Sequence, residues 1–194
     1  MCKDKNEYSS MTIYKQIIGV EKCSDLIYSS RKGRTRLKHK IFFWLVVQNR
    51  INTRDLLQRK GFNLDCFHCA CCNIRTPETT LHLFWDCSFA HRCWITIIPF
   101  KMRGTSFYNE TSLALQQLPK EFGLEIIILG LWHIWKLRNG LIFRQERLYV
   151  QEWRRNMAQD LKLLGHRIKL IHKDRLQQWM EELRRDWGPY LFLL

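Results

Sequence analysis

The chain has 194 residues, of which 46% are hydrophobic and 26% are charged. This composition is typical of a globular protein of ordinary domain size, and it excludes a wholly disordered chain and a fibrous repeat protein. Lys and Arg outnumber Asp and Glu by 32 to 18, which gives a formal net charge of +14. Polyanions are therefore the natural class of partner.

The positive charge is concentrated near the N-terminal third of the chain. Residues 31–60 alone carry a formal net charge of +9, and Asp55 is the one acid among them. Such a run fits either a solvated helical face or a surface that binds phosphates. The six cations at its start cannot all be neutralised by Asp55, and they are Arg31, Lys32, Arg34, Arg36, Lys38 and Lys40.

Two helices are predicted in this basic stretch. Residues 37–48 have a nearly continuous apolar centre, which indicates a buried helix, although periodicity alone does not distinguish it from a buried strand. After it, Asn52 or Thr53 is a suitable N-cap for a short helix, and Gly61 is a suitable terminator.

Residues 64–87 contain five of the eight cysteines and have no clean helical or strand period. Zinc binds four thiolate or imidazole ligands at tetrahedral corners. Cys69 and Cys72 form a Cys-x-x-Cys pair, and His82 and Cys87 form a second local pair, so these four residues make a Cys3His set. The spacing leaves an alternative open, in which Cys66 pairs with Cys69. Other possible ligands or packed thiols are His68, Cys71, His91 and Cys93.

The rest of the chain reads as helices. Ser88 begins a predicted helix that ends before Pro99, and residues 100–120 form a polar connection with at most one short helix near Ser112–Leu118. Residues 121–143 are strongly apolar. Beyond them, an apolar stripe runs from Trp153 to Trp187 at helical spacing, with a break or bend expected near Gly165.

The N-terminus lacks the apolar core of a secretory signal, and the apolar run from Phe122 to Trp135 is too short to span a bilayer. We therefore expect an intracellular protein, in the nucleus or the cytoplasm, with no membrane partner. Cysteines in such a protein are expected to be metal ligands or buried thiols.

Five segments, read in order, resemble one family: the reverse-transcriptase zinc-binding domain of plant non-LTR (LINE-type) retrotransposons. They are Lys38–Leu45 (KHKIFFWL), Asn49–Arg59 (NRINTRDLLQR), the pair Cys69 and Cys72, Glu78–Trp94 (ETTLHLFWDCSFAHRCW) and Trp132–Phe143 (WHIWKLRNGLIF). The resemblance covers residues 12–187, and Ser29–Leu37 is longer and more basic than the usual lead.

The resemblance implies one structural zinc ion bound by Cys69, Cys72, His82 and Cys87, with Cys66 outside the site. It also implies a stand-alone fragment. From the helical patterns above we expect a mainly α fold, with a small Cys3His module embedded between helices and a long amphipathic C-terminal helix. The expected organisation is a basic lead (1–36), the zinc-binding domain (37–98), a linker (99–120), a helical extension (121–187) and a tail (188–194).

Catalytic motifs are absent from the sequence. It has no Tyr-x-Asp-Asp turn of a polymerase, no P-loop and no Gly-x-Ser-x-Gly, and a closed four-ligand zinc site leaves no position for a reacting water. We therefore expect neither an enzyme nor a small-molecule substrate.

Two functions remain. The first is sequence-independent binding of RNA or DNA by the six cations above, with Trp85 as a surface on which a base could stack. The second is a structural or protein-interaction module, in which zinc only stabilises the fold and the C-terminal helix binds a partner or a second copy.

Overall fold

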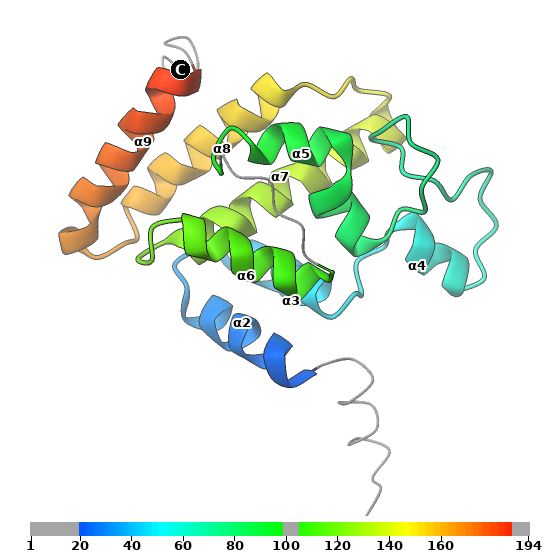
Figure 1. The fold of residues 1–194 in the computed structure, drawn as a ribbon, viewed down its shortest axis with the longest axis horizontal. Coiled ribbons are helices and arrows are strands. Elements are labelled where there is room, and N and C mark those ends of the chain that lie inside the picture. The colour runs from blue at the N-terminus through cyan, green and yellow to red at the C-terminus, as the bar shows by residue number, and fades with distance from the viewer. Residues whose placement is uncertain (1–19, 99–104, 188–194) are drawn as a thin grey trace, which may run out of the picture.

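The computed structural model describes residues 20–98 and 105–187, and these are mainly helical (Figure 1). The single β-bridge of the described ranges joins His68 and Pro77. The helices are α2 (Val20–Lys32), α3 (Leu37–Val47), α4 (Arg54–Arg59), the π-helical turn η1 (His82–Asp86), α5 (Ser88–Trp94), α6 (Phe107–Gln117), α7 (Gly123–Arg144), α8 (Val150–Gly165), the 3-10 turn η2 (Leu170–His172) and α9 (Lys173–Trp187).

The central element is α7, which packs against α2, α3, α6 and α8. Its apolar residues surround the whole helix, and residues 126–129 are all buried, as expected of a helix in the middle of a core. Among the described residues α7 also has the length and composition of a membrane span. Because protein helices cover most of it and it buries Glu125, His133 and Arg138, we read it as the core helix of this fold.

The two helices predicted in the basic stretch are α3 and α4. The apolar centre of residues 37–48 is helical and buries Phe42, Phe43 and Val46. Thr53 is the N-cap of α4, where its side chain accepts a hydrogen bond from the backbone N–H of Leu56. Gly61 follows α4 with a φ of 77°, a left-handed conformation that glycine adopts without strain.

The C-terminal stripe is divided between two helices, α8 and α9, and the break after Gly165 falls where the sequence predicts a bend. Trp179 and Leu183 of α9 are buried, and the Trp179 ring meets Phe122 edge-on at 6.1 Å. These two side chains pack inside the chain. They therefore do not form an open seam for another protein.

The predicted linker at residues 99–120 contains α6. This helix is longer than expected and begins five residues earlier, because Ser106 caps it by accepting a hydrogen bond from the N–H of Asn109. The buried face of α6, which includes Thr111 and Ala114, packs on α7. The helices on either side of these residues share one apolar core.

The crossing of α5, α7 and α8 centres on Gly130. A Cβ at this position would collide with the Trp94 ring of α5, so a side chain there would have to displace the indole. The carbonyl of Gly130 accepts a hydrogen bond from the Trp153 indole of α8 at 3.1 Å. This close approach joins the cysteine-bearing half of the chain to the C-terminal helices.

Candidate metal centre

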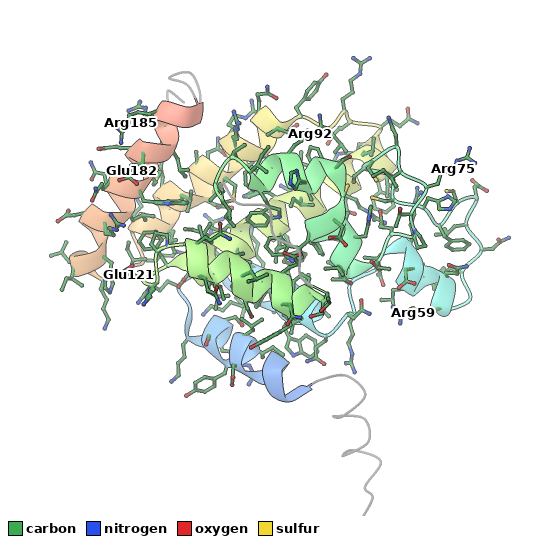
Figure 2. The ribbon with its side chains drawn as sticks, viewed as in Figure 1. Arg59, Arg75, Arg92, Glu121, Glu182 and Arg185 are labelled. Atoms are coloured by element: carbon green, nitrogen blue, oxygen red, sulfur yellow. The ribbon has the colours of Figure 1, made fainter. Side chains whose placement is uncertain are left out.

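A short hairpin within residues 61–79, called the hairpin below, contains the first two cysteines of the predicted set, Cys69 and Cys72. The N–H of Cys69 donates to the carbonyl of Thr76 at 2.9 Å, and the N–H of Glu78 donates to that of Phe67 at 3.2 Å. These bonds close a loop whose turn contains Cys72. The hairpin lies at the right edge of the molecule next to α4, and Arg75 points outward from it (Figure 2).

The second pair of residues is positioned by the π-helical turn η1. Here the N–H of Cys87 donates to the carbonyl of His82 at 2.7 Å, a bond between residues five apart. In an α-helix, residues five apart point in different directions, whereas the wider π turn brings them to the same side. Thr79 holds the start of this turn, because its hydroxyl accepts a hydrogen bond from the N–H of His82.

The ligand atoms of Cys69, Cys72, His82 and Cys87 all lie within 4.8 Å of one another. The Cys69 and Cys87 sulfurs are 3.8 Å apart, and the Cys72 sulfur is 3.4 Å from Nε2 of His82. Two thiolates ~2.3 Å from a tetrahedral zinc ion lie about 3.8 Å apart. The structure therefore brings the four predicted residues together around one point, and two of the pairs lie at distances that a single tetrahedral ion requires.

The thiols of this cluster are held in their protonated form when no cation is present. Hydrogen bonding to Cys69, followed by burial, raises the pKa of Cys87 to about 12. The pKa of Cys69 is raised chiefly by a hydrogen bond with Cys71, and burial raises that of Cys72. A bound divalent cation reverses this preference, because thiolates are its ligands. Three thiols and an imidazole are a donor set that fits zinc.

The other candidate ligands lie outside the cluster. Cys66 is exposed, and its sulfur is 3.3 Å from Nδ1 of His68. Cys71 is buried beside the cluster without being part of it. Cys93 is fully buried in the apolar core, and this burial raises the pKa of its thiol, in keeping with the packed thiol expected there.

The hairpin has little apolar packing of its own. Of residues 61–79, the buried side chains are Cys69, Cys71 and Glu78, while Phe62 and Ile74 are exposed. The adjoining residues differ sharply, because Leu83, Phe84 and Phe89 are fully buried in the helical core. The cluster thus lies between a segment without an apolar core and a segment that belongs to one.

A buried ion pair connects the hairpin to α7. Both carboxylate oxygens of Glu78 accept hydrogen bonds from the guanidinium of Arg138, at 2.5 and 3.3 Å. The same carboxylate accepts the N–H of Arg54 at the start of α4, and the Arg138 guanidinium lies over the Trp135 ring. Sequence reasoning assigned no role to Glu78 or Arg138. The one signal in the sequence was their position, because Glu78 and Arg138 each occur in a segment quoted for the family resemblance.

The predicted nucleic-acid residues fall into three groups. Trp85 is 5% exposed and stacks on Trp94 at 4.8 Å, so protein covers its ring in this structure. Arg34 lies 3.7 Å from the Glu125 carboxylate and donates to the carbonyl of Glu121, which gives it a structural role. The other five cations form no ion pair with a carboxylate in the described ranges, and they are Arg31, Lys32, Arg36, Lys38 and Lys40.

The fold and the cluster together define a helical protein with a Cys3His group that could hold one metal ion. Residues 8–94 match the family model described as zinc-binding in reverse transcriptase. The matched segment contains all four residues of the cluster and ends at the last residue of α5. We predicted that the family resemblance extends over residues 12–187. The family model matches only the first part of this range, and Trp132–Phe143 lies outside the matched residues. No curated protein and no solved structure matches the chain.

Proposed function

We propose that this chain is a non-catalytic zinc-binding module that binds RNA or DNA without sequence preference. The origin we propose is a plant non-LTR retrotransposon. The match of residues 8–94 to a zinc-binding region of reverse transcriptases supports the class. The plant and LINE origin is supported by the segments that resemble that family.

Zinc has a structural role in this proposal. Three cysteines and one histidine use all four positions of a tetrahedral ion, so no position is left for a water or a substrate. The ion would hold the hairpin turn against η1 and would take the place of the apolar packing that residues 61–79 lack. We propose an intracellular location, in the nucleus or the cytoplasm, because thiols that serve as metal ligands stay reduced in such a compartment.

The observation that carries nucleic-acid binding is the unneutralised charge at the α2–α3 junction. Arg31, Lys32 and Lys38 are exposed, and neither they nor Arg36 and Lys40 pair with a described carboxylate. Cations that no carboxylate neutralises bind phosphates by releasing the counterions of the nucleic acid, and affinity then falls log-linearly with salt. Phosphate contacts carry no sequence information, so binding would be nearly indifferent to sequence.

The test replaces these five cations with Ala and measures binding of a labelled 15-nucleotide RNA at low and moderate salt. A matched control removes the same charge from exposed cations elsewhere, namely Lys120, Lys136, Arg147, Arg155 and Lys169. We expect the junction variant to lose about tenfold or more in affinity and to show a shallower salt dependence, while the control changes little. Equal affinity of the two variants would contradict the proposal.

The alternative is a structural module that associates with a second copy of the chain. One observation favours it: a groove of about 570 Å³ lies between α8 and α9, and its apolar lining includes Leu161, Leu176 and Met180. Concentration-dependent dimerisation that is lost on Met180→Glu, with no binding of RNA, would favour this alternative.

A further inference from the structure

The α2–α3 junction exposes apolar side chains as well as cations. Tyr28, on the last turns of α2, is 60% exposed, and Leu37 and Ile41, one turn apart on α3, are 71% and 51% exposed. Isolated exposed apolar residues are ordinary, but these three lie within fourteen residues of one another on two helices that pack together. Figure 1 shows α2 at the lower edge of the molecule, far from the hairpin and α9.

Cations are interleaved with these apolar side chains. The Lys32 ammonium lies 4.3 Å from the centre of the Tyr28 ring, and the Lys40 ammonium donates to the carbonyl of Arg31 at 2.8 Å. The second contact connects the first turns of α3 to the last turn of α2, so the two sets of residues share one corner of the molecule. Two carboxylates lie close to this corner: Glu125 pairs with Arg34, and Asp160, bonded to His133, is near enough to Arg36 to interact with it. Arg31, Lys32, Lys38 and Lys40 pair with neither, so the corner keeps a positive charge.

This combination fits single-stranded nucleic acid better than a duplex. A duplex offers a protein its phosphates while its bases remain stacked inside, and the exposed Tyr28 ring would gain nothing from it. A single strand presents phosphates and the faces of unpaired bases together, and exposed aromatic rings beside cations are the surfaces on which such bases stack. Stacking on one ring is sequence-tolerant, which agrees with a site that lacks a base-reading helix.

We propose that the α2–α3 junction is a binding site for single-stranded RNA or DNA, in which Tyr28 stacks on a base and Lys32 and Lys40 bind the neighbouring phosphates. The inference rests on the proposed function, because it needs the same cations to attract the strand. It goes further in naming the strandedness of the ligand and the aromatic residue that replaces Trp85 as the stacking surface.

The experiment measures three ligands against the full chain loaded with zinc: a 15-nucleotide single-stranded RNA, a 15-base-pair DNA duplex, and heparin as a polyanion without bases. The variants are Tyr28→Ala, Tyr28→Phe and, as a matched control, Tyr149→Ala, which removes an exposed tyrosine from a different part of the surface. Thermal unfolding of each variant verifies that an exposed side chain was removed without loss of the fold.

We expect Tyr28→Ala to lose about fivefold to a hundredfold in affinity for the single strand, because one base–aromatic stack is removed. Its affinity for the duplex and for heparin should stay within about twofold of the parent. Tyr28→Phe keeps the ring and should bind the single strand like the parent, as should Tyr149→Ala.

Several results would overturn the inference. They are an unchanged affinity of Tyr28→Ala for the single strand, an equal loss for all three ligands, or a dimer of the parent that Tyr28→Ala dissociates, which would make the corner a protein contact. These failures are distinct from failure of the proposed function. If the proposed function fails, the parent binds no polyanion, or the five-cation Ala variant binds the single strand as tightly as the parent.

Discussion

The hairpin and the helical core are stabilised by different forces. The core helices α3, α5, α7 and α8 bury large apolar side chains on facing surfaces, with Phe43, Phe89 and Trp153 fully covered. The hairpin of residues 61–79 buries two thiols and one carboxylate, while Phe62 and Ile74 are exposed and Leu64 and Phe67 are only half-buried. Hydrophobic burial can stabilise the first region, whereas the second needs another source of free energy.

The metal cluster and the fold depend on each other through the hairpin. Metal binding by the four ligands can supply the free energy of folding that the hairpin lacks. The ion pair of Glu78 with Arg138 then holds the hairpin against α7. The dependence is one-sided, because the core has its own apolar packing and the hairpin does not. We expect the hairpin to open without metal while the core helices persist.

The largest expected effect is loss of the metal. Cys72→Ser and Cys87→Ser each remove one of the four converging ligands, and zinc content should fall from about one ion per chain to near zero. Cys66→Ser is the matched control, because this thiol lies in the same hairpin but outside the cluster. Metal analysis of the purified variants checks the prediction, and a loss of zinc in Cys66→Ser would mean that the alternative ligand set is the right one.

The next largest effect is expected from the buried ion pair of Glu78 and Arg138, which connects the hairpin to the helical core. Arg138→Leu leaves the Glu78 carboxylate buried without its partner, and we expect a loss of about 3–5 kcal/mol in the free energy of unfolding. The control is Arg144→Leu, which breaks an ion pair of similar geometry with Glu146 on the surface and should change stability little. Urea unfolding measures both, and similar losses would show that Glu78–Arg138 has no special weight.

A smaller effect lies inside the core and depends on pH. Burial lowers the pKa of His39 from 6.5 to about 4, partly offset by Asp160, and Lys38, His133 and Arg36 lower it further. The unfolded chain therefore binds this proton more tightly than the folded protein. Stability should fall as the pH drops from about 6.5 to 4, by up to about 3 kcal/mol from this residue.

His39→Phe keeps the ring contact with Trp132 and removes the titration. In saturating zinc, the unfolding free energy of this variant should depend less on pH than that of the parent between pH 6.5 and 5. Parallel pH profiles of the two proteins would contradict the assignment.

The smallest of these effects concerns the packing of the core. Gly130→Ala places a methyl group against the Trp94 ring at the crossing of α5, α7 and α8, and we expect a loss of about 1–3 kcal/mol in stability. Because the change lies in the core, zinc content should remain unchanged. Gly61→Ala would also destabilise the chain, through its positive φ, but with no crowded neighbour.

The sequence was most informative where a local pattern decides the structure. The apolar centre of α3, the Thr53 cap and the break at Gly165 are local signals, and the structure agrees with each. The four cluster residues were found because paired ligand spacing and family resemblance agree.

The remaining features depend on contacts that are distant in sequence or on unusual backbone geometry. The π-helical turn that aligns His82 with Cys87 has no simple sequence pattern, and the Glu78–Arg138 pair joins residues 60 positions apart. Trp85 looked available for stacking because it adjoins a ligand. Its burial is a tertiary effect of Trp94, and Tyr28 lies on a surface that the sequence alone did not distinguish.

The most direct test of the account is hydrogen exchange of the zinc-loaded protein before and after chelation, resolved along the chain. The account predicts that amides of residues 64–82, such as those of Cys69 and Glu78, lose their protection when zinc is removed, while α7 and α8 keep theirs. Unchanged protection of residues 64–82 after confirmed metal removal would contradict a structural role for the ion. Loss of protection throughout α7 and α8 would contradict the independence of the core.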